Sequence, residues 1–428
     1  MAQRALTAAW YALTATLLWA AAMIATSSNA QAQIAHIGFV EVLKNGVDGV
    51  LGMQGSTDVT VSPDGRHVYV ASYSNGTVTV FTRNISTGRL VFEGTLNTPD
   101  LVSAYATEVS PDGKYVYVGT GGSTSNNVLV YARDATTGLL TFIQKNDGGV
   151  LGLQSKGFAS LSISGDGKSV YALTNTVSGL VVFSRNTADG TLSLVEEHVD
   201  GVNDNLLGQE YSTTGPVSGI ALSSDGAFAY VTSMQDNAVT VFARDANTGA
   251  LTRVSTAVDG VDGVAGIRGA VSTVISPDQR YLYVSGTSDN SVVAFSRDET
   301  TGALTYLGKQ TNGVDGVNSL LGVRALAASP DGRYVYASAF NDRTVTVFQK
   351  NDVTGLLSVA GFVRNGTDGV DGIAYASGIT TDPLGKHLYA VGQQGSIAVF
   401  NLPIPSIVLS TTAQTADENG PAITLDPG

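Results

Sequence analysis

The sequence contains no cysteine and little positive charge. Its 428 residues include 23 Lys and Arg against 36 Asp and Glu, which gives a net charge of −13. Without cysteine, disulfide scaffolds, cysteine zinc sites and thiol nucleophiles are excluded. The acidic balance argues against nucleic-acid binding and against a partner at an anionic lipid surface, because binding phosphate groups needs a basic surface. We therefore expect no nucleic acid among the partners.

Long apolar runs are also scarce, and the one that spans about 20 residues lies at the N-terminus. Arg4 precedes an apolar stretch over residues 5–25, and the small-residue pattern Ala-Gln-Ala follows at residues 30–32. We predict a signal peptide over residues 1–32, with an uncleaved anchor as the alternative. Cleavage would remove both tryptophans and release a secreted or periplasmic chain that has no membrane contact.

The sequence is rich, by contrast, in an internal repeat built around a Ser-Pro-Asp-Gly turn. Seven copies follow one another at spacings of 48, 54, 59, 53, 53 and 53 residues. Pro presets the backbone of the turn, while Asp and Gly suit its later positions. Seven copies at this period indicate a closed or stacked array of equivalent units. The copies begin at Ser62, Ser110, Ser164, Ser223, Ser276, Ser329 and Asp382, the last of them degraded.

Each copy shows the same pattern of four short strands. One strand precedes the turn, an alternating strand such as residues 67–71 follows it, and a third strand of the Val-x-Val-Phe type comes next. A turn containing Thr-Gly then leads into the fourth strand. Four antiparallel strands per unit form a propeller blade, and no 3.6-residue apolar period supports a helical solenoid. We predict an all-β, seven-bladed β-propeller of four-stranded antiparallel blades.

The two ends of the repeat array indicate how the ring closes. The seventh copy stops after its third strand, near residue 400, whereas residues 42–49 match the end of the sixth copy's outer strand and its exit loop. We therefore predict that the N-terminal strand completes the last blade, which removes a free sheet edge. The propeller is assigned to residues 33–402. Residues 403–428 are assigned to a linker and a candidate start of a second β domain.

The repeat resembles the lactonase-type seven-bladed propellers, which include 6-phosphogluconolactonase-like and YVTN-repeat proteins. The resemblance covers residues 35–402 and rests on the Ser-Pro-Asp-Gly turn, the Tyr-Val-Tyr-Val strand and the Val-x-Val-Phe strand. It implies the propeller fold and a hydrolase of the carboxylic-ester type that acts on a lactone. Enzymatic members of the family commonly carry an Arg-His pair at the start of an innermost strand. Here the arginine position is matched by Arg324, but the next residue is Ala325.

Three residues in the aligned positions are candidates for a site at the channel mouth. Arg324 is the candidate for binding the carboxylate of a small acidic sugar or lactone, because its guanidinium can form a bidentate contact. Asp58 would orient a hydroxyl group or act as a base on water. Tyr105 is expected near them as a substrate-binding residue. The alternative is an Arg324–Asp58 ion pair that only lines the channel. His67 and His387, which follow their turns, are expected to be exposed.

The loops that join consecutive blades repeat an Asn/Asp-Gly-Val-Asp-Gly motif. Asp-Gly pairs are tight-turn residues, which favours a structural role. Carboxylates beside backbone carbonyls would also suit Ca²⁺, so calcium binding at the channel mouth is the competing hypothesis; no cofactor is expected to be required. The candidate metal ligands are Asp48, Asp147, Asp200, Asp259, Asp262, Asp315, Asp368 and Asp371.

Three functions therefore remain open at this level. One is a lactone hydrolase that acts on a small sugar-derived ligand. Another is a non-catalytic extracellular or periplasmic scaffold that binds a protein or polysaccharide, with the acidic loops as calcium sites. A divalent-ion-dependent propeller that processes polysaccharide is a third, more remote alternative. We expect a monomer in each case.

Overall fold

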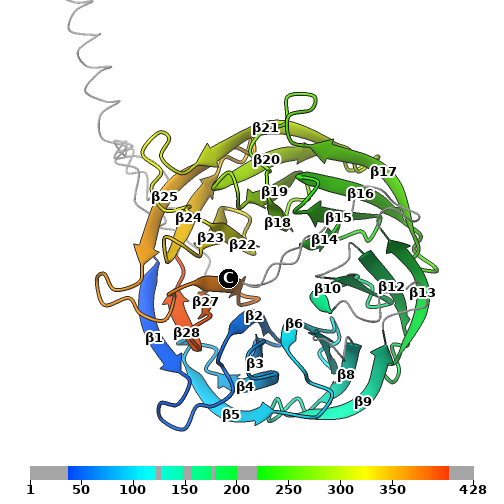
Figure 1. The fold of residues 1–428 in the computed structure, drawn as a ribbon, viewed down its shortest axis with the longest axis vertical. Coiled ribbons are helices and arrows are strands. Elements are labelled where there is room, and N and C mark those ends of the chain that lie inside the picture. The colour runs from blue at the N-terminus through cyan, green and yellow to red at the C-terminus, as the bar shows by residue number, and fades with distance from the viewer. Residues whose placement is uncertain (1–36, 122–126, 148–156, 175–178, 200–218, 404–428) are drawn as a thin grey trace, which may run out of the picture.

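The computed structural model describes residues 37–121, 127–147, 157–174, 179–199 and 219–403, and these form seven four-stranded antiparallel sheets around a central channel (Figure 1). Each sheet is one blade, and three strands of every blade flank the Ser-Pro-Asp-Gly turn and the hairpin that follows it. The predicted fold class, the number of blades and the strand count per blade are confirmed. The described residues contain no helix of the length and apolarity needed to cross a membrane.

Blades one to six each consist of four strands that are consecutive in the chain and run from the channel outward. Blade one contains β2 (Ser56–Val61), β3 (His67–Ser72), β4 (Thr77–Arg83) and β5 (Leu90–Leu96). Blade two contains β6 (Ala104–Val109), β7 (Tyr115–Thr120), β8 (Asn127–Arg133) and β9 (Leu140–Asp147). Blade three contains β10 (Phe158–Ile163), β11 (Ser169–Thr174), β12 (Gly179–Arg185) and β13 (Leu192–Val199).

The next three blades repeat this order. Blade four contains β14 (Ile220–Leu222), β15 (Phe228–Ser233), β16 (Ala238–Arg244) and β17 (Leu251–Val258). Blade five contains β18 (Ala270–Ile275), β19 (Tyr281–Gly286), β20 (Ser291–Arg297) and β21 (Leu304–Thr311). Blade six contains β22 (Val323–Ala328), β23 (Tyr334–Ala339), β24 (Thr344–Lys350) and β25 (Leu357–Arg364).

Blade seven is assembled from both ends of the described chain. Its three inner strands are β26 (Ala376–Thr381), β27 (His387–Gly392) and β28 (Ser396–Asn401), and its outer strand is β1 (Gly38–Lys44). β1 pairs antiparallel with β28, from Gly38 opposite Asn401 to Lys44 opposite Ser396. The predicted closure by the N-terminal strand is therefore confirmed. The predicted signal peptide lies outside the described residues, and so does the C-terminal extension beyond Pro403.

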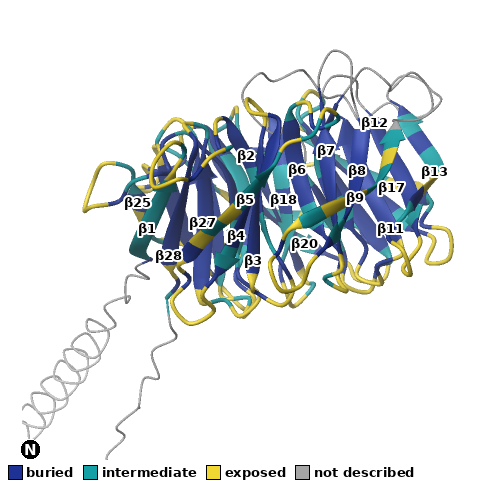
Figure 2. Cartoon of the chain, turned by 90° about the horizontal axis from the view of Figure 1, so that it is seen from below, coloured by how far each residue is buried: buried dark blue, intermediate teal, exposed yellow. Residues whose placement is uncertain are grey.

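The core lies between the blades rather than within any one of them. The two middle strands of each blade are buried almost throughout, whereas the outer strands carry exposed side chains (Figure 2). One tyrosine in the second strand of every blade is fully buried: Tyr69, Tyr117, Tyr171, Tyr230, Tyr283, Tyr336 and Tyr389. These rings pack against aliphatic side chains of the adjacent blade, for example Tyr69 against Val116 and Val118. Burial of this surface between neighbours holds the ring together.

Buried polar contacts reinforce most of the junctions between blades, and they correct the expectation for two histidines. His67 and His387 are only 1% and 2% exposed, so the prediction that they are exposed was wrong. The Nδ1 atom of each lies beside an arginine of the following blade, at 2.6 Å from Arg133 Nη2 and 2.8 Å from Arg83 Nη2. Burial, together with the charge of Arg133, lowers the pKa of His67, which favours the neutral ring as an acceptor.

Candidate functional site

The candidate site residues come from the innermost strands, at the end where each strand begins. In blades one, two, three, five and seven, the first pairing of this strand skips one residue in a β-bulge. In blade six the irregularity is wider and spans Val323 to Leu326. A bulge changes the direction in which a side chain points. Arg324 and Ala325 are the two residues within the wider irregularity.

A hollow of about 140 Å³ occupies this end of the channel. Blades one, four, five, six and seven contribute to its lining, which includes Asp58, Ser272, Arg324, Ala325 and Ser377. The structure therefore brings Asp58 and Arg324 to one hollow, although they are 266 positions apart in the sequence. Such a concave site, lined by apolar and small polar groups and one charge of each sign, suits a small polar ligand.

Arg324 is held by an aromatic side chain of its own blade. Its guanidinium carbon lies 4.0 Å from the centre of the Phe340 ring, a cation–π contact, and Phe340 in turn packs on Tyr375 of blade seven. Burial lowers the pKa of Arg324 to about 10, because water solvates the charge less well there. Arg324 therefore remains cationic at neutral pH in a poorly hydrated position, where it can attract an anionic group on a ligand.

Asp58 is positioned by the neighbouring blade. Its Oδ2 atom accepts a hydrogen bond of 2.8 Å from the backbone nitrogen of Thr107. Burial raises the pKa of Asp58, and the hydrogen bonds from Thr107 and Val59 oppose that shift only in part. A carboxylate with a raised pKa is a better proton acceptor than an ordinary surface aspartate. Asp58 thus has the chemistry of a general base beside the hollow.

A second carboxyl group in the channel was missed by the sequence analysis. Glu108 follows Thr107 on β6, and burial together with the charge of Asp58 raises its pKa to about 8. Because Asp58 already carries its charge when Glu108 titrates, the two groups lose their protons in sequence. At neutral pH Glu108, with a pKa of about 8, is the neutral acid. The sequence held one signal for Glu108. It is a charged residue at a strand position where blade one has the uncharged Thr60 and blade three the uncharged Ser162.

The structure separates the three predicted mouth residues into two groups. Asp58 and Arg324 line the same hollow, yet no ion pair joins them in the described part of the chain. Tyr105 does not line that hollow within the described residues. Its backbone oxygen accepts a hydrogen bond of 2.8 Å from Thr57 Oγ1, and its ring packs on Tyr73 at 5.1 Å between centres. A substrate-binding role for Tyr105 stays a prediction.

The inter-blade loops show a structural use for the repeated motif. The first residue of the motif is Asn45, Asp259, Asn312 or Asn365, and its side chain accepts a backbone hydrogen bond of 3.0–3.1 Å from the residue eight positions later. The fourth residue of the motif is Asp48, Asp262, Asp315 or Asp368. It adopts a φ of 48–51°, as the tight Asp-Gly turn requires. Both positions of the motif therefore shape the loop itself.

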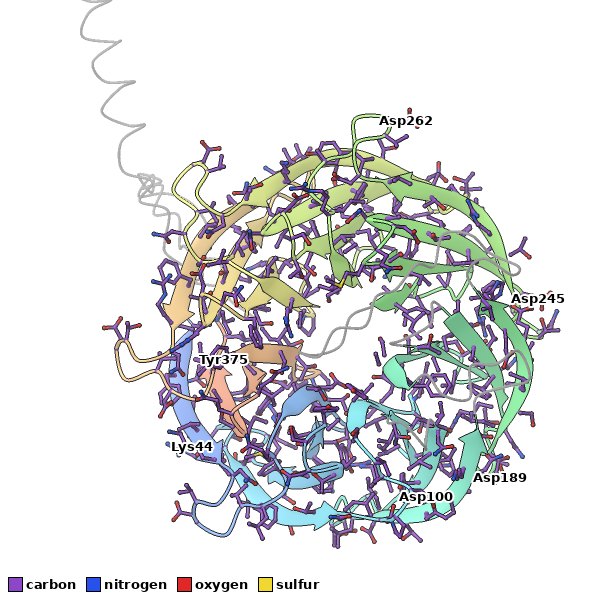
Figure 3. All side chains as sticks on the ribbon, viewed as in Figure 1. Lys44, Asp100, Asp189, Asp245, Asp262 and Tyr375 are labelled. Atoms are coloured by element: carbon purple, nitrogen blue, oxygen red, sulfur yellow. The ribbon has the colours of Figure 1, made fainter. Side chains whose placement is uncertain are left out.

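The tips of the inter-blade loops were expected at the channel mouth, and the structure places one of them elsewhere. In the four loops that the structure describes, the turn closes directly after an outer strand, as the hydrogen bond from Gly260 N to Val264 O beyond β17 shows. Asp262 accordingly sits at the outer rim of the ring (Figure 3). The expectation that these aspartates surround the channel mouth is wrong for this loop. The cause is the early turn, which forms before the chain crosses to the next innermost strand.

Calcium binding by the acidic loops stays a prediction. Within the described residues, no three His, Asp or Glu side chains come close enough together to hold a metal ion. Asp371 forms an ion pair with Lys44. Asp200 lies outside the described residues, and Asp147 ends β9 with only its backbone described.

The model of the lactonase family, described as a seven-bladed β-propeller, matches residues 22–151 and 212–367 of the chain. No curated protein matches the chain. Two solved structures with the same fold are lactonases by description. The periplasmic gluconolactonase of Pseudomonas aeruginosa is 23% identical, with a TM-score of 0.58, over 77% of this chain and 96% of that chain. A putative 6-phosphogluconolactonase of Bacteroides uniformis is 22% identical, with a TM-score of 0.59, over 79% of this chain and 90% of that chain.

The same fold also occurs in a protein with a different described activity. Hydrazine synthase of Kuenenia stuttgartiensis is 18% identical, with a TM-score of 0.57, over 84% of this chain and 99% of that chain. At these identities the solved structures support the propeller fold alone, because one fold hosts unrelated functions. The chemistry must therefore be argued from the hollow that contains Asp58 and Arg324.

Proposed function

Because the chain belongs to the family of seven-bladed lactonase β-propellers, we propose that it hydrolyses a small sugar-derived lactone in the hollow between Asp58 and Arg324. One observation carries the proposal. A carboxyl group with a raised pKa and a buried guanidinium line the same small hollow. This arrangement brings a base and a cation within reach of one small polar ligand.

The reaction can be written with these two groups. Asp58 accepts a proton from a water molecule while the water oxygen bonds to the lactone carbonyl carbon. The ring C–O bond then breaks, and the released alkoxide takes up the proton that Asp58 accepted, so that lactone and water give one hydroxy acid and Asp58 is a carboxylate again. Arg324 binds the oxygen on which negative charge develops and the carboxylate of the product. Glu108, as a neutral acid, allows Asp58 to ionise without a second negative charge beside it.

Export is the second part of the proposal. The predicted signal peptide over residues 1–32 and the likeness in fold to a lactonase described as periplasmic both support a periplasmic or secreted location. A lactone outside the cytoplasm would then be the substrate class, with the ligand entering from the mouth of the channel. Cell fractionation with an antibody against the propeller tests this part independently of activity.

A non-catalytic binding module is the second candidate function. Ala325 stands where enzymatic family members commonly carry histidine, and it lines the hollow beside Arg324. In this alternative the hollow binds a sugar acid without turning it over, and the acidic loops bind Ca²⁺ weakly. Calorimetric titration of EDTA-treated protein with Ca²⁺ tests the metal: absence of both heat and a melting shift contradicts it.

The deciding experiment is lactone hydrolysis by purified residues 33–428, with and without Ca²⁺. Gluconolactone and 6-phosphogluconolactone are the substrates, and Arg324→Ala, Arg324→Lys and Asp58→Asn are the variants. Arg343→Ala is the matched control, because Arg343 is another arginine near the mouth that stacks on Tyr375 and does not line the hollow. Activity that survives in Arg324→Ala and Asp58→Asn contradicts the assignment of this hollow. Binding of gluconate without turnover in the parent protein favours the second candidate.

A further inference from the structure

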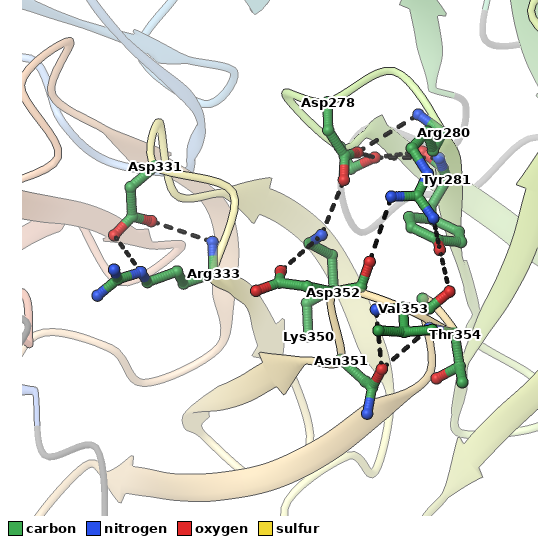
Figure 4. A network of polar contacts seen from close by, with 12 residues as sticks. Asp278, Arg280, Tyr281, Asp331, Arg333, Lys350, Asn351, Asp352, Val353 and Thr354 are labelled. Atoms are coloured by element: carbon green, nitrogen blue, oxygen red, sulfur yellow. Dashed lines mark hydrogen bonds and ion pairs between the residues drawn. The ribbon is translucent and has the colours of Figure 1, made fainter.

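On the face opposite the channel mouth, a cationic side chain fastens six of the seven blades to the blade before it. Five of these cations form an ion pair of 2.8–3.1 Å with the aspartate of the preceding turn: Arg83 with Asp382, Arg133 with Asp64, Arg185 with Asp112, Arg244 with Asp166 and Lys350 with Asp278. A sixth cation, Arg297, occupies the same position beside Asp225, and its charge helps to lower the pKa of that aspartate. Figure 4 shows the pair formed by Lys350 and Asp278.

A tyrosine and a glycine carbonyl complete the same fastening. In six blades the buried tyrosine donates a hydrogen bond of 2.8–3.0 Å to a glycine carbonyl in the turn between the third and fourth strands of the next blade. The arginine of that next blade donates its Nε hydrogen to the tyrosine hydroxyl, as Arg133 does to Tyr69. It also donates Nη1 to a carbonyl in its own blade's turn, Gly113 O for Arg133. One guanidinium thus meets three acceptors at the junction.

The junction between blades six and seven lacks both parts in the described chain. Leu402 stands in the position of the cation, because its backbone nitrogen bonds to Lys386 O as the nitrogen of Arg133 bonds to Lys114 O. The Thr-Gly turn is missing there, since the outer strand of blade seven is β1 rather than a continuation of β28. The acceptors remain in place as Asp331, Tyr336 and the carbonyl of Gly385.

A hollow of about 700 Å³ lies at this incomplete junction. Its lining includes Asp331, Gly385, Asn401, Leu402 and Pro403. The Asp331 side chain is 44% exposed, against 30–36% for the aspartates paired with Arg133, Arg185, Arg244 and Lys350. Its contact with Arg333 is at 4.0 Å, and Figure 4 shows this pair apart from the network around Lys350. The carboxylate is therefore available to a cation that enters the hollow.

We propose that this junction is a docking site for an arginine side chain of a partner polypeptide, which supplies the cation that blade seven lacks. Its guanidinium would bind the Asp331 carboxylate and the Gly385 carbonyl, and its stem would lie on Leu402 and Pro403. Residues 403–428 of the chain contain neither arginine nor lysine, so they cannot supply this group. The site lies at the opposite end of β22 from Arg324, and the proposal is independent of lactone hydrolysis.

The basic residues nearby do not oppose such an occupant. Arg333 and Lys386 each follow the Asp-Gly or Leu-Gly of their turn, and blades one, two, three and five carry a basic residue at the same position: Arg66, Lys114, Lys168 and Arg280. The turn aspartates of those four blades nonetheless form ion pairs with the cation of the next blade. A basic neighbour is thus compatible with a bound guanidinium, since long side chains extend into water.

The test uses N-acetyl-arginine amide as the probe, titrated into purified residues 33–428 by calorimetry and by thermal shift. We expect saturable binding in the millimolar range and a higher melting temperature, with no such effect from the neutral isostere N-acetyl-citrulline amide. Asp331→Asn should weaken binding at least tenfold while the fold is kept, since this carboxylate is exposed. Leu402→Arg should fill the site from within, abolish probe binding and raise the melting temperature of the protein itself.

Glu299→Gln is the matched control, because it removes one exposed negative charge from the same face at blade five. It should leave probe binding unchanged. Three results would each overturn the proposal: no saturable binding to the parent protein, equal binding of the citrulline probe, or binding that Asp331→Asn and Glu299→Gln reduce to the same extent. If Leu402→Arg does not fold, Asp331→Asn against Glu299→Gln decides.

Discussion

The Oδ2 atom of Asp58 lies 2.8 Å from the backbone nitrogen of Thr107, so blade two donates a hydrogen bond to the carboxyl group of blade one. This bond positions Asp58, which lines the hollow together with Arg324 and whose charge raises the pKa of Glu108. Each of the three groups comes from a different innermost strand. Their pKa values are displaced by the same cause, burial in a narrow channel. Four predictions test this geometry and the ring that supports it.

The first prediction concerns Asp58 as a base. If it accepts the proton of water, Asp58→Asn should lower kcat by a factor of about 10² to 10⁴, with a smaller change in KM. In the parent protein the rate should rise with pH through the raised pKa of Asp58, because only the carboxylate can accept a proton. Initial rates between pH 4 and pH 8 measure both effects. An unchanged pH profile in Asp58→Asn would assign the base to another group.

The second prediction concerns the pH dependence of stability at Glu108. Its pKa is about 8 in the folded chain, against an ordinary value of 4.5, so the folded state binds this proton more tightly. The stability that this group contributes is complete at low pH and is lost as pH rises from about 4.5 to about 8. Glu108→Gln should therefore raise the free energy of unfolding by roughly 2 kcal/mol at pH 9, and change it little at pH 5.

Urea unfolding of the parent protein and of Glu108→Gln at the two pH values measures this difference. Glu299→Gln, an exposed carboxyl group, serves as the control and should show no gain at pH 9. An equal effect of Glu108→Gln at both pH values would mean that its carboxyl group does not titrate in this window.

The third prediction concerns the fully buried ion pair between Arg83 and Asp382, whose nitrogen and oxygen atoms lie 3.0 Å apart. Arg83→Met should lower the free energy of unfolding by about 3–5 kcal/mol, because it leaves Asp382 buried without its cation. Arg333→Met, which removes an exposed arginine from the same face, should change it by less than about 0.5 kcal/mol. Urea unfolding at pH 7 compares the two variants. A similar loss of unfolding free energy in both variants would contradict the claim that burial makes the Arg83–Asp382 pair important for stability.

The third prediction extends to the pH dependence of the same ion pairs, which acid should weaken. Hydrogen bonds and the neighbouring Arg133 hold the pKa of Asp64 down at about 2, and the pKa of Asp112, Asp166, Asp278 and Asp382 is lowered as well. A depressed pKa stabilises the fold above the unfolded value of 3.8, and this contribution is lost as pH falls through the folded value. The melting temperature should accordingly drop steeply between pH 4 and pH 2.

The fourth prediction concerns closure of the ring by β1. Deleting residues 33–46 removes the outer strand of blade seven and exposes the edge of β28, so the melting temperature should fall by more than about 10 °C. Deleting residues 404–428 is the matched control and should leave the melting temperature nearly unchanged. Differential scanning calorimetry of both deletions provides the measurement. Equal melting of the parent and of the 33–46 deletion would contradict a role of β1 in stability.

The repeat in the sequence was sufficient to predict most of the fold. Turn chemistry and alternating strands are local properties, so seven copies predicted seven blades. The match of residues 42–49 to the end of the sixth copy predicted the closure by β1, which the pairing of Gly38 with Asn401 confirms. Alignment of the innermost strands also selected Arg324 and Asp58, because equivalent positions in a ring of blades converge on one channel.

Tertiary contacts decided what local patterns could not. His67 and His387 look like exposed strand residues in the sequence, yet each is covered by the arginine of the next blade. Glu108 became notable only beside Asp58, since its pKa depends on a charge from another strand. The lack of a cation at Leu402 can be recognised only by comparison with the six cations at the equivalent junctions. The sequence thus determined the four-stranded blade and the number of blades. The burial of a side chain, its hydrogen-bond partners and its charge state depend on contacts between blades, so the closed ring decided them.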